Sequence, residues 1–126
     1  MDLIPHSRSQ PDPSATLTKA LVRAVVLLGL SQAALADVLG VSPATASRLV
    51  GGRYTLQPAR KREWEFALLF VRLFRSLDAI VGNDREAQAW LRDQNRALGA
   101  RPLDLIRSAE GLVRVLQYLD ASRGRV

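Results

Sequence analysis

The segment from Gln32 to Leu49 constrains the fold most strongly, because two short helical patterns meet there at a glycine. Ser31 is a suitable N-cap for the first helix. Gly40 supplies the corner, where a positive φ has no steric cost for glycine. The residues that return to one buried face are Leu35, Ala36, Leu39 and Val41. The segment therefore predicts a helix-turn-helix.

The second helix of this pair has the composition of a helix that enters the DNA major groove. Ser42 caps it, and Pro43 occupies the first helical position, where a missing N–H costs nothing. Its inner side is Ala46, Leu49 and Val50. Arg48 can bind guanine and the Thr45 methyl can contact thymine. The expected DNA contacts are Gln32, Ser42, Pro43, Ala44, Thr45, Ser47, Arg48, Arg53 and Arg60. Helical hairpins that never touch DNA also have this layout, so that alternative stays open.

Positive charge gathers around the same segment. Residues 1–62 carry 8 basic and 3 acidic side chains, whereas residues 63–126 carry 10 and 9. Between residues 42 and 62 there are five basic residues and no acid. This distribution favours phosphate binding and predicts an affinity for operator DNA that falls steeply with salt.

The side-chain inventory gives little support to an enzyme. The chain has no cysteine and one histidine, His6, which lies in a proline- and serine-rich segment. We expect residues 1–15 to form a flexible arm and predict no catalytic residue, metal site, cofactor or small-molecule substrate. Residues 19–36 resemble a short secretory signal, but Leu17, Leu21, Val25 and Leu28 repeat at helical spacing. We therefore expect an amphipathic first helix and a cytoplasmic protein.

A long helix is predicted from about Pro58 to Val81, and its charged flank excludes a membrane span. Its wide apolar stripe fits either a central core helix or a homodimer interface. The residues expected at that interface are Phe66, Phe70, Leu73, Phe74 and Leu77.

A further helix is expected to begin at Asp84 and to end between Asn95 and Gly99. A short turn follows after Pro102, and the last helix is expected from Ser108 to Ser122. No alternating strand pattern competes with them. The predicted fold is all-α, with a helix-turn-helix domain over residues 16–62. The long helix and a small C-terminal helical domain follow over residues 63–126.

Residues 89–120, AWLRDQNRALGARPLDLIRSAEGLVRVLQYLD, resemble the C-terminal toxin-binding domain of the Xre/MbcA/ParS antitoxin family. With the helix-turn-helix ahead of it, the resemblance covers about residues 17–126. The chain departs from the family pattern at Ala100, where a second glycine is frequent, and in the tail ASRGRV. The matching positions are Ala89, Trp90, Leu91, Asn95, Ala97, Leu98, Gly99, Pro102, Leu103, Asp104, Leu105, Ile106, Glu110, Gly111, Val113 and Leu119.

This resemblance implies a type II antitoxin that binds a RES-domain toxin and represses its own operon. Such toxins attack NAD by hydrolysis, phosphorolysis or ADP-ribosyl transfer, and the antitoxin's C-terminal region approaches the mouth of the NAD pocket. The Val126 carboxylate would then stand in for phosphate oxygens. The expected toxin contacts are Arg101, Asp104, Ser122, Arg123, Gly124, Arg125 and Val126.

Two alternatives remain open for the C-terminal half. The tail can be a frayed basic terminus without a role. The whole chain can also be a stand-alone transcriptional regulator whose C-terminal half only dimerises. In both readings a homodimer is expected, because one helix-turn-helix reads too few base pairs for useful specificity.

Overall fold

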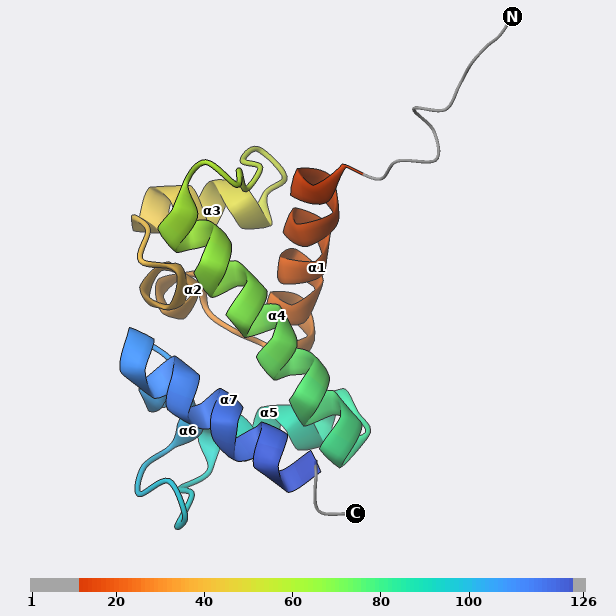
Figure 1. Cartoon of the computed structure of the whole chain (residues 1–126), viewed down its shortest axis with the longest axis vertical. Helices are drawn as coiled ribbons and strands as arrows, with labels where there is room; N and C mark the ends of the chain where they lie inside the picture. Colours follow the sequence, from red (N-terminus) through yellow and green to blue (C-terminus); the bar gives the residue numbers. More distant parts are fainter. Residues whose placement is uncertain (1–11, 124–126) are drawn as a thin grey trace, which may run out of the picture.

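A computed structural model describes residues 12–123, and within them it confirms the all-α prediction. Seven helices follow one another along this part of the chain, without a strand (Figure 1). They are α1 (Pro13–Leu28), α2 (Gln32–Leu39), α3 (Pro43–Val50), α4 (Lys61–Val81), α5 (Asp84–Arg92), α6 (Pro102–Leu105) and α7 (Ala109–Arg123).

Helix α1 begins earlier than the sequence suggested. Asp12 is its N-cap, and the Asp12 carboxylate accepts a hydrogen bond of 3.0 Å from the Ser14 backbone N–H. Pro13 occupies the first turn, where its missing N–H costs nothing. The predicted arm over residues 1–15 is therefore wrong at its C-terminal end, and His6 lies outside the described residues.

The helix-turn-helix prediction is confirmed in its local chemistry. The Ser31 hydroxyl accepts a 3.0 Å hydrogen bond from the Ala34 N–H and caps α2. Gly40 has a φ of 71° at the corner, a value that favours glycine over other residues. The Ser42 hydroxyl caps α3 by accepting from the Thr45 N–H at 3.1 Å.

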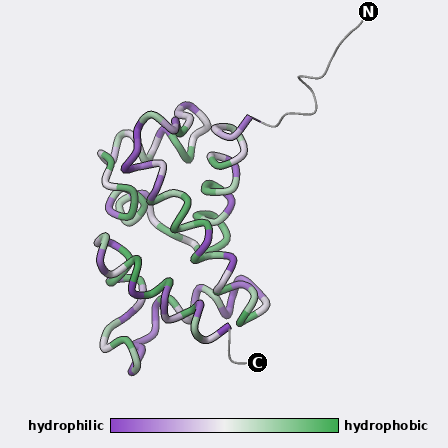
Figure 2. Tube along the Cα trace, viewed as in Figure 1, coloured by the Kyte–Doolittle hydropathy of each residue, from purple (hydrophilic) through white to green (hydrophobic). Residues whose placement is uncertain are grey.

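Helix α4 lies across the whole molecule and contacts α1, α2, α5 and α7 (Figure 1). Hydrophobic residues recur along it where it faces these helices (Figure 2). It begins at Lys61 rather than Pro58, because residues 58–60 form a turn. No helix in residues 12–123 is long and apolar enough to cross a membrane.

The C-terminal helices follow the predicted order, but α5 ends at Arg92, before the expected close at Asn95–Gly99. Residues 95–100 instead form a tight loop, in which the Asn95 side chain accepts from the Leu98 N–H at 3.0 Å. Gly111 allows α7 to meet the end of α6, since a Cβ there would overlap the Leu105 carbonyl oxygen. Trp90 is half-buried and stacks on Tyr118, with ring centroids 6.4 Å apart.

Candidate functional surfaces

The outer face of α3 presents a short chain of hydrogen-bonded polar groups. The Ser42 hydroxyl donates to the Thr45 hydroxyl at 3.0 Å, and the Arg48 guanidinium donates to the same Thr45 oxygen at 3.2 Å. Pro43 and Ala44 are exposed beside them. A small, polar surface with one arginine fits a helix that lies close to base edges.

The other predicted DNA contacts occupy neighbouring positions. Gln32 is exposed in the first turn of α2, Ser47 is half-buried on α3, and Arg53 is exposed just after α3. Ala46 and Leu49 are fully buried beneath the α3 face. The core therefore fixes the side of α3 that faces solvent.

Arg60 is held in place by a tyrosine that the sequence analysis did not select. Its guanidinium donates to the Tyr54 hydroxyl at 2.7 Å and lies 5.6 Å from the ring centroid. The Tyr54 hydroxyl in turn donates to the Glu63 carboxylate at 2.7 Å. Burial, followed by the hydrogen bond to Glu63, raises the pKa of Tyr54. In the sequence, the only signal for this arrangement of Tyr54 is that an aromatic residue lies between two arginines, Arg53 and Arg60.

Two predicted residues of the C-terminal half form an exposed ion pair. The Arg101 guanidinium donates two hydrogen bonds to the Asp104 carboxylate, of 3.0 and 2.8 Å. These bonds lower the pKa of Asp104 and raise the pKa of Arg101. The pair is a fixed, planar polar group at the N-terminal end of α6 and is exposed to solvent.

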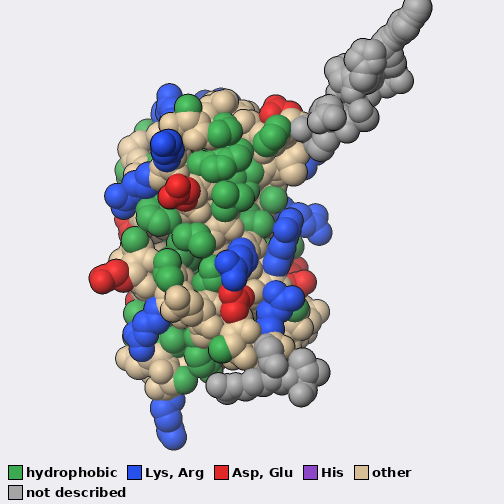
Figure 3. Space-filling model, in the orientation of Figure 1, with side chains coloured by type: hydrophobic (Ala, Val, Ile, Leu, Met, Phe, Trp, Pro, Cys, Tyr) green, Lys and Arg blue, Asp and Glu red, His purple; other side chains and the backbone are tan. Residues whose placement is uncertain are grey.

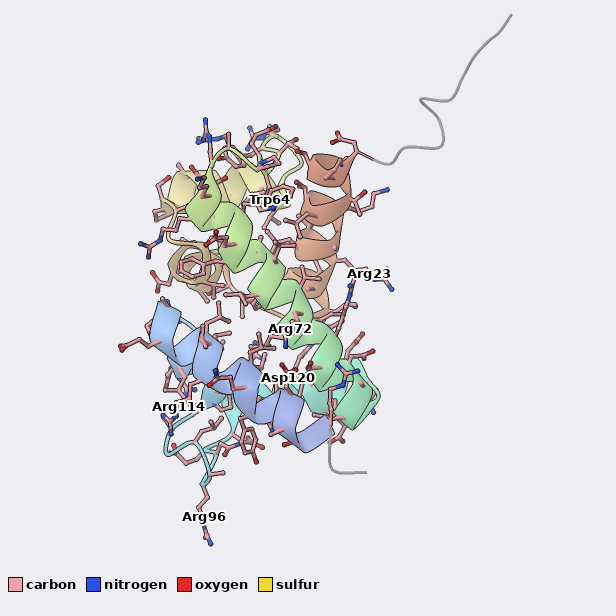
Figure 4. All side chains as sticks on the ribbon, in the orientation of Figure 1. Arg23, Trp64, Arg72, Arg96, Arg114 and Asp120 are labelled. Carbon is pink, nitrogen blue, oxygen red and sulfur yellow. The ribbon has the colours of Figure 1, made fainter. Side chains whose placement is uncertain are left out.

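Two further arginines, neither expected from the sequence, are associated with the loop beside this pair. Arg114 on α7 donates to the Leu98 carbonyl at 2.8 Å and so fastens the loop. Arg96 extends away from the protein at the end of the loop (Figure 4). An amphipathic pattern marks the helices but gives no signal for these loop contacts.

The end of α7 is fastened to α4 by a polar cluster. Ser76 is fully buried, donates to the Asp120 carboxylate at 3.0 Å and accepts from Arg123 at 3.1 Å. Arg72 forms an ion pair with Asp120, which lies beside it in Figure 4. Ser122 donates to the Tyr118 carbonyl at 2.9 Å.

Two of the expected toxin contacts, Ser122 and Arg123, lie in or beside this cluster. Ser122 and Arg123 belong to the last turn of α7 and are held by contacts within the protein. Gly124, Arg125 and Val126 lie outside the described residues.

Burial corrects the dimer interface expected on α4 at three of its five residues. Phe70, Leu73 and Leu77 are fully buried within the single chain, so they cannot pack against another copy. Phe66 and Phe74 are half-buried against the same core. The periodicity located the stripe, but it could not show that α1, α2, α5 and α7 cover it.

The two halves of the protein are joined at the C-terminus of α1 and on α2. Gln88 and Arg92 of α5 donate to the carbonyls of Leu27, Leu28 and Gly29 at 2.9, 3.2 and 2.7 Å. These carbonyls have no partner within α1, because Leu27 and Leu28 belong to its last turn and Gly29 is its C-cap. Arg107, between α6 and α7, forms an ion pair of 2.8 Å with Asp37 on α2. Within residues 12–123, no three histidine or acidic side chains gather in a metal-binding group.

The structure thus defines a class of small all-α protein, in which a helix-turn-helix with an exposed polar second helix is joined through α4 to a second helical unit. Comparison with known families identifies the particular one. The model described as the antitoxin Xre-like helix-turn-helix domain matches residues 7–72. The model described as the antitoxin Xre/MbcA/ParS C-terminal toxin-binding domain matches residues 76–125. The chain belongs to the Xre/MbcA/ParS antitoxin family.

A solved structure supports the same assignment. The chain resembles a protein in the crystal structure of the M. tuberculosis MbcT–MbcA toxin–antitoxin complex, with 25% sequence identity and a TM-score of 0.64. The match covers 87% of this chain and 96% of the other. No curated protein sequence matches the chain.

Proposed function

We propose that this protein is the antitoxin of a type II system, that it neutralises a RES-domain toxin acting on NAD, and that it represses its own operon. The observation that carries the proposal is the presence of a toxin-binding domain and an Xre-like helix-turn-helix on one chain. In this proposal the chain catalyses no reaction itself. It acts in the cytoplasm, where NAD and operator DNA are both found.

The proposed toxin contact involves the exposed face of the C-terminal domain and the residues that follow α7. Arg101 and Asp104 provide a fixed polar group, and residues 124–126 approach the NAD pocket. The fastening of Arg123 to buried Ser76 supports this arrangement, because it sets the position from which these residues leave the domain.

The toxin proposal is tested by measuring cellular NAD after induction of the gene next to that of this chain, which the proposal expects to encode the toxin. The gene is expressed alone, with the full chain, and with a chain that ends at Arg123. This truncation preserves the bond from Arg123 to Ser76, so it removes only residues 124–126. NAD loss that only the full chain prevents would support blocking by these residues. Protection by both chains would move the inhibitory contact to the folded domain.

An absence of NAD loss with the toxin gene alone would contradict the proposed toxin chemistry. A stand-alone regulator, whose C-terminal half only dimerises, would then be the better explanation. That alternative also predicts that neither chain copurifies with the neighbouring gene product.

The proposed repressor binds as a dimer to an inverted repeat, with half-sites about 34 Å or a multiple of that apart. Arg48→Ala should cost about 1–3 kcal/mol at the operator and relax one base position. Arg60→Ala should weaken all sequences alike, because the geometry with Tyr54 suits a phosphate contact. Both are measured by gel shift on operator and random DNA. An equal loss on both DNAs for Arg48→Ala would make Arg48 a phosphate contact only.

A further inference from the structure

The connection between α3 and α4, residues 51–60, is held in place by the rest of the protein. The Arg53 backbone N–H donates to the Arg48 carbonyl at 2.8 Å and so fixes the start of the connection on α3. Further along, the Leu56 side chain is fully buried, and its backbone N–H donates to the Thr18 hydroxyl on α1 at 3.0 Å. The side chains on either side of Leu56 therefore leave the protein from fixed positions.

Tyr54 in this connection fixes the direction of the Arg60 side chain. The Tyr54 hydroxyl donates to the Glu63 carboxylate at 2.7 Å, and a carboxylate at neutral pH has no proton to donate in return. The Tyr54 oxygen is thereby left to accept the 2.7 Å hydrogen bond from Arg60, whose guanidinium also lies 5.6 Å from the centre of the ring. This bond uses one N–H of the guanidinium, and the remaining N–H groups can bind an acceptor outside the protein.

The charge of Arg60 is not neutralised by its neighbours. Glu63 bonds to Tyr54 instead, and within residues 12–123 no salt bridge includes Arg60. Lys and Arg side chains lie at the upper left of the face shown in Figure 3, where α3 and the start of α4 are found. A fixed arginine in a basic surface is suited to bind phosphate oxygens, because its planar fork matches their geometry. The other exposed basic residues close to it in the sequence are Arg53, Lys61 and Arg62.

We propose that Tyr54 is a positioning residue for DNA binding, which holds Arg60 ready to contact a phosphate of the DNA backbone. An unrestrained arginine loses conformational entropy when DNA fixes it, whereas Arg60 is already restricted in the free protein. The DNA backbone is the source of the phosphate, because the connection directly follows α3, the helix expected to read bases. The contact adds affinity but carries no sequence information.

This inference rests on the DNA binding proposed above and adds a residue on which one of its contacts depends. Tyr54 acts through Arg60 and makes no contact with DNA itself, so loss of its hydroxyl should matter only while Arg60 is present. Tyr54→Phe keeps the aromatic ring beneath the Arg60 guanidinium and removes the hydroxyl alone.

The test is the binding of fluorescently labelled DNA to the full chain, measured by anisotropy over a range of KCl concentrations. One duplex is the region upstream of the chain's own gene, and the other is a random sequence of equal length. Arg60→Ala should reduce the salt slope by about 0.9 for each bound copy, which is the value for one phosphate. Tyr54→Phe should weaken binding to both duplexes by about threefold to tenfold. The double variant Tyr54→Phe/Arg60→Ala should bind no more weakly than Arg60→Ala alone.

Tyr118→Phe removes the hydroxyl of the only other tyrosine, which lies on α7, and is the matched control that should bind as the wild type does. Thermal melting of each variant shows that it is folded. An unchanged affinity in Tyr54→Phe, or a full further loss in the double variant, would overturn the positioning role and leave the proposed DNA binding intact. A loss confined to the upstream duplex would overturn the backbone contact and make Tyr54 part of base recognition. A wild type that binds neither duplex would overturn both this inference and the proposed repressor.

Discussion

Gly111 shows how one residue determines whether the last two helices can meet. A Cβ at this position would overlap the backbone carbonyl oxygen of Leu105, which cannot move aside as a side chain can. We expect Gly111→Ala to destabilise the protein by about 1–3 kcal/mol, despite alanine's higher helix propensity. Thermal denaturation followed by circular dichroism measures this. Val113→Ala, on the exposed side of α7, is the control and should melt close to the wild type.

The ion pair of Asp104 with Arg101 predicts how the stability of the protein depends on pH. The hydrogen bonds from Arg101 lower the pKa of Asp104, so they favour the charged carboxylate in the folded state. Their contribution to stability is present above the ordinary carboxyl pKa and is lost as the pH falls through the lowered value. An NMR titration should find the Asp104 pKa below the ordinary value, and higher in Arg101→Ala. An unchanged pKa in that variant would contradict the assignment.

Among the contacts between helices, those of Arg92 on α5 join the C-terminal half to the helix-turn-helix half at the end of α1. Its guanidinium donates to the carbonyls of Leu28 and Gly29 at the end of α1 and to Gln88 on its own helix. Charge-assisted bonds to otherwise unpaired carbonyls should make Arg92→Ala cost about 1–3 kcal/mol in unfolding free energy. Urea denaturation measures this. Arg85→Ala removes an exposed arginine from the same α5 helix and should have little effect.

How much the sequence predicts also differs from element to element. The corner at Gly40 and the caps at Ser31 and Ser42 depend on neighbouring residues, so local patterns located α2 and α3 closely. The end of α5 was misplaced because Gly99, a suitable helix terminator, belongs to a separate loop closed by Asn95. The Ser76–Asp120–Arg123 cluster and the Arg92 contacts join residues far apart in the chain, which periodicity does not reveal.

In the whole molecule, α4 belongs to the core of both halves, since it contacts α1 and α2 as well as α5 and α7. The division at residues 62 and 63 therefore follows the sequence motifs but not the packing. Phe70 is buried midway along α4, so its side chain supports a core that neither half completes alone. The ion pair between Arg107 and Asp37 adds a surface contact across the same junction.

The two tryptophans allow this shared core to be tested. Trp64 lies near the N-terminal end of α4, Trp90 lies on α5, and the chain has no other tryptophan. Trp90→Phe leaves a fluorescence probe of the first half, and Trp64→Phe leaves a probe of the second. If α4 makes the protein one cooperative unit, each probe should give the same urea midpoint as circular dichroism of that variant.

Phe70→Ala, added to either variant, should lower the fluorescence midpoint and the circular dichroism midpoint together, with a cost of about 3–5 kcal/mol in the free energy of unfolding. A fluorescence midpoint that differs from the circular dichroism midpoint would show instead that the halves unfold separately, and that α4 connects two domains rather than forming their common core.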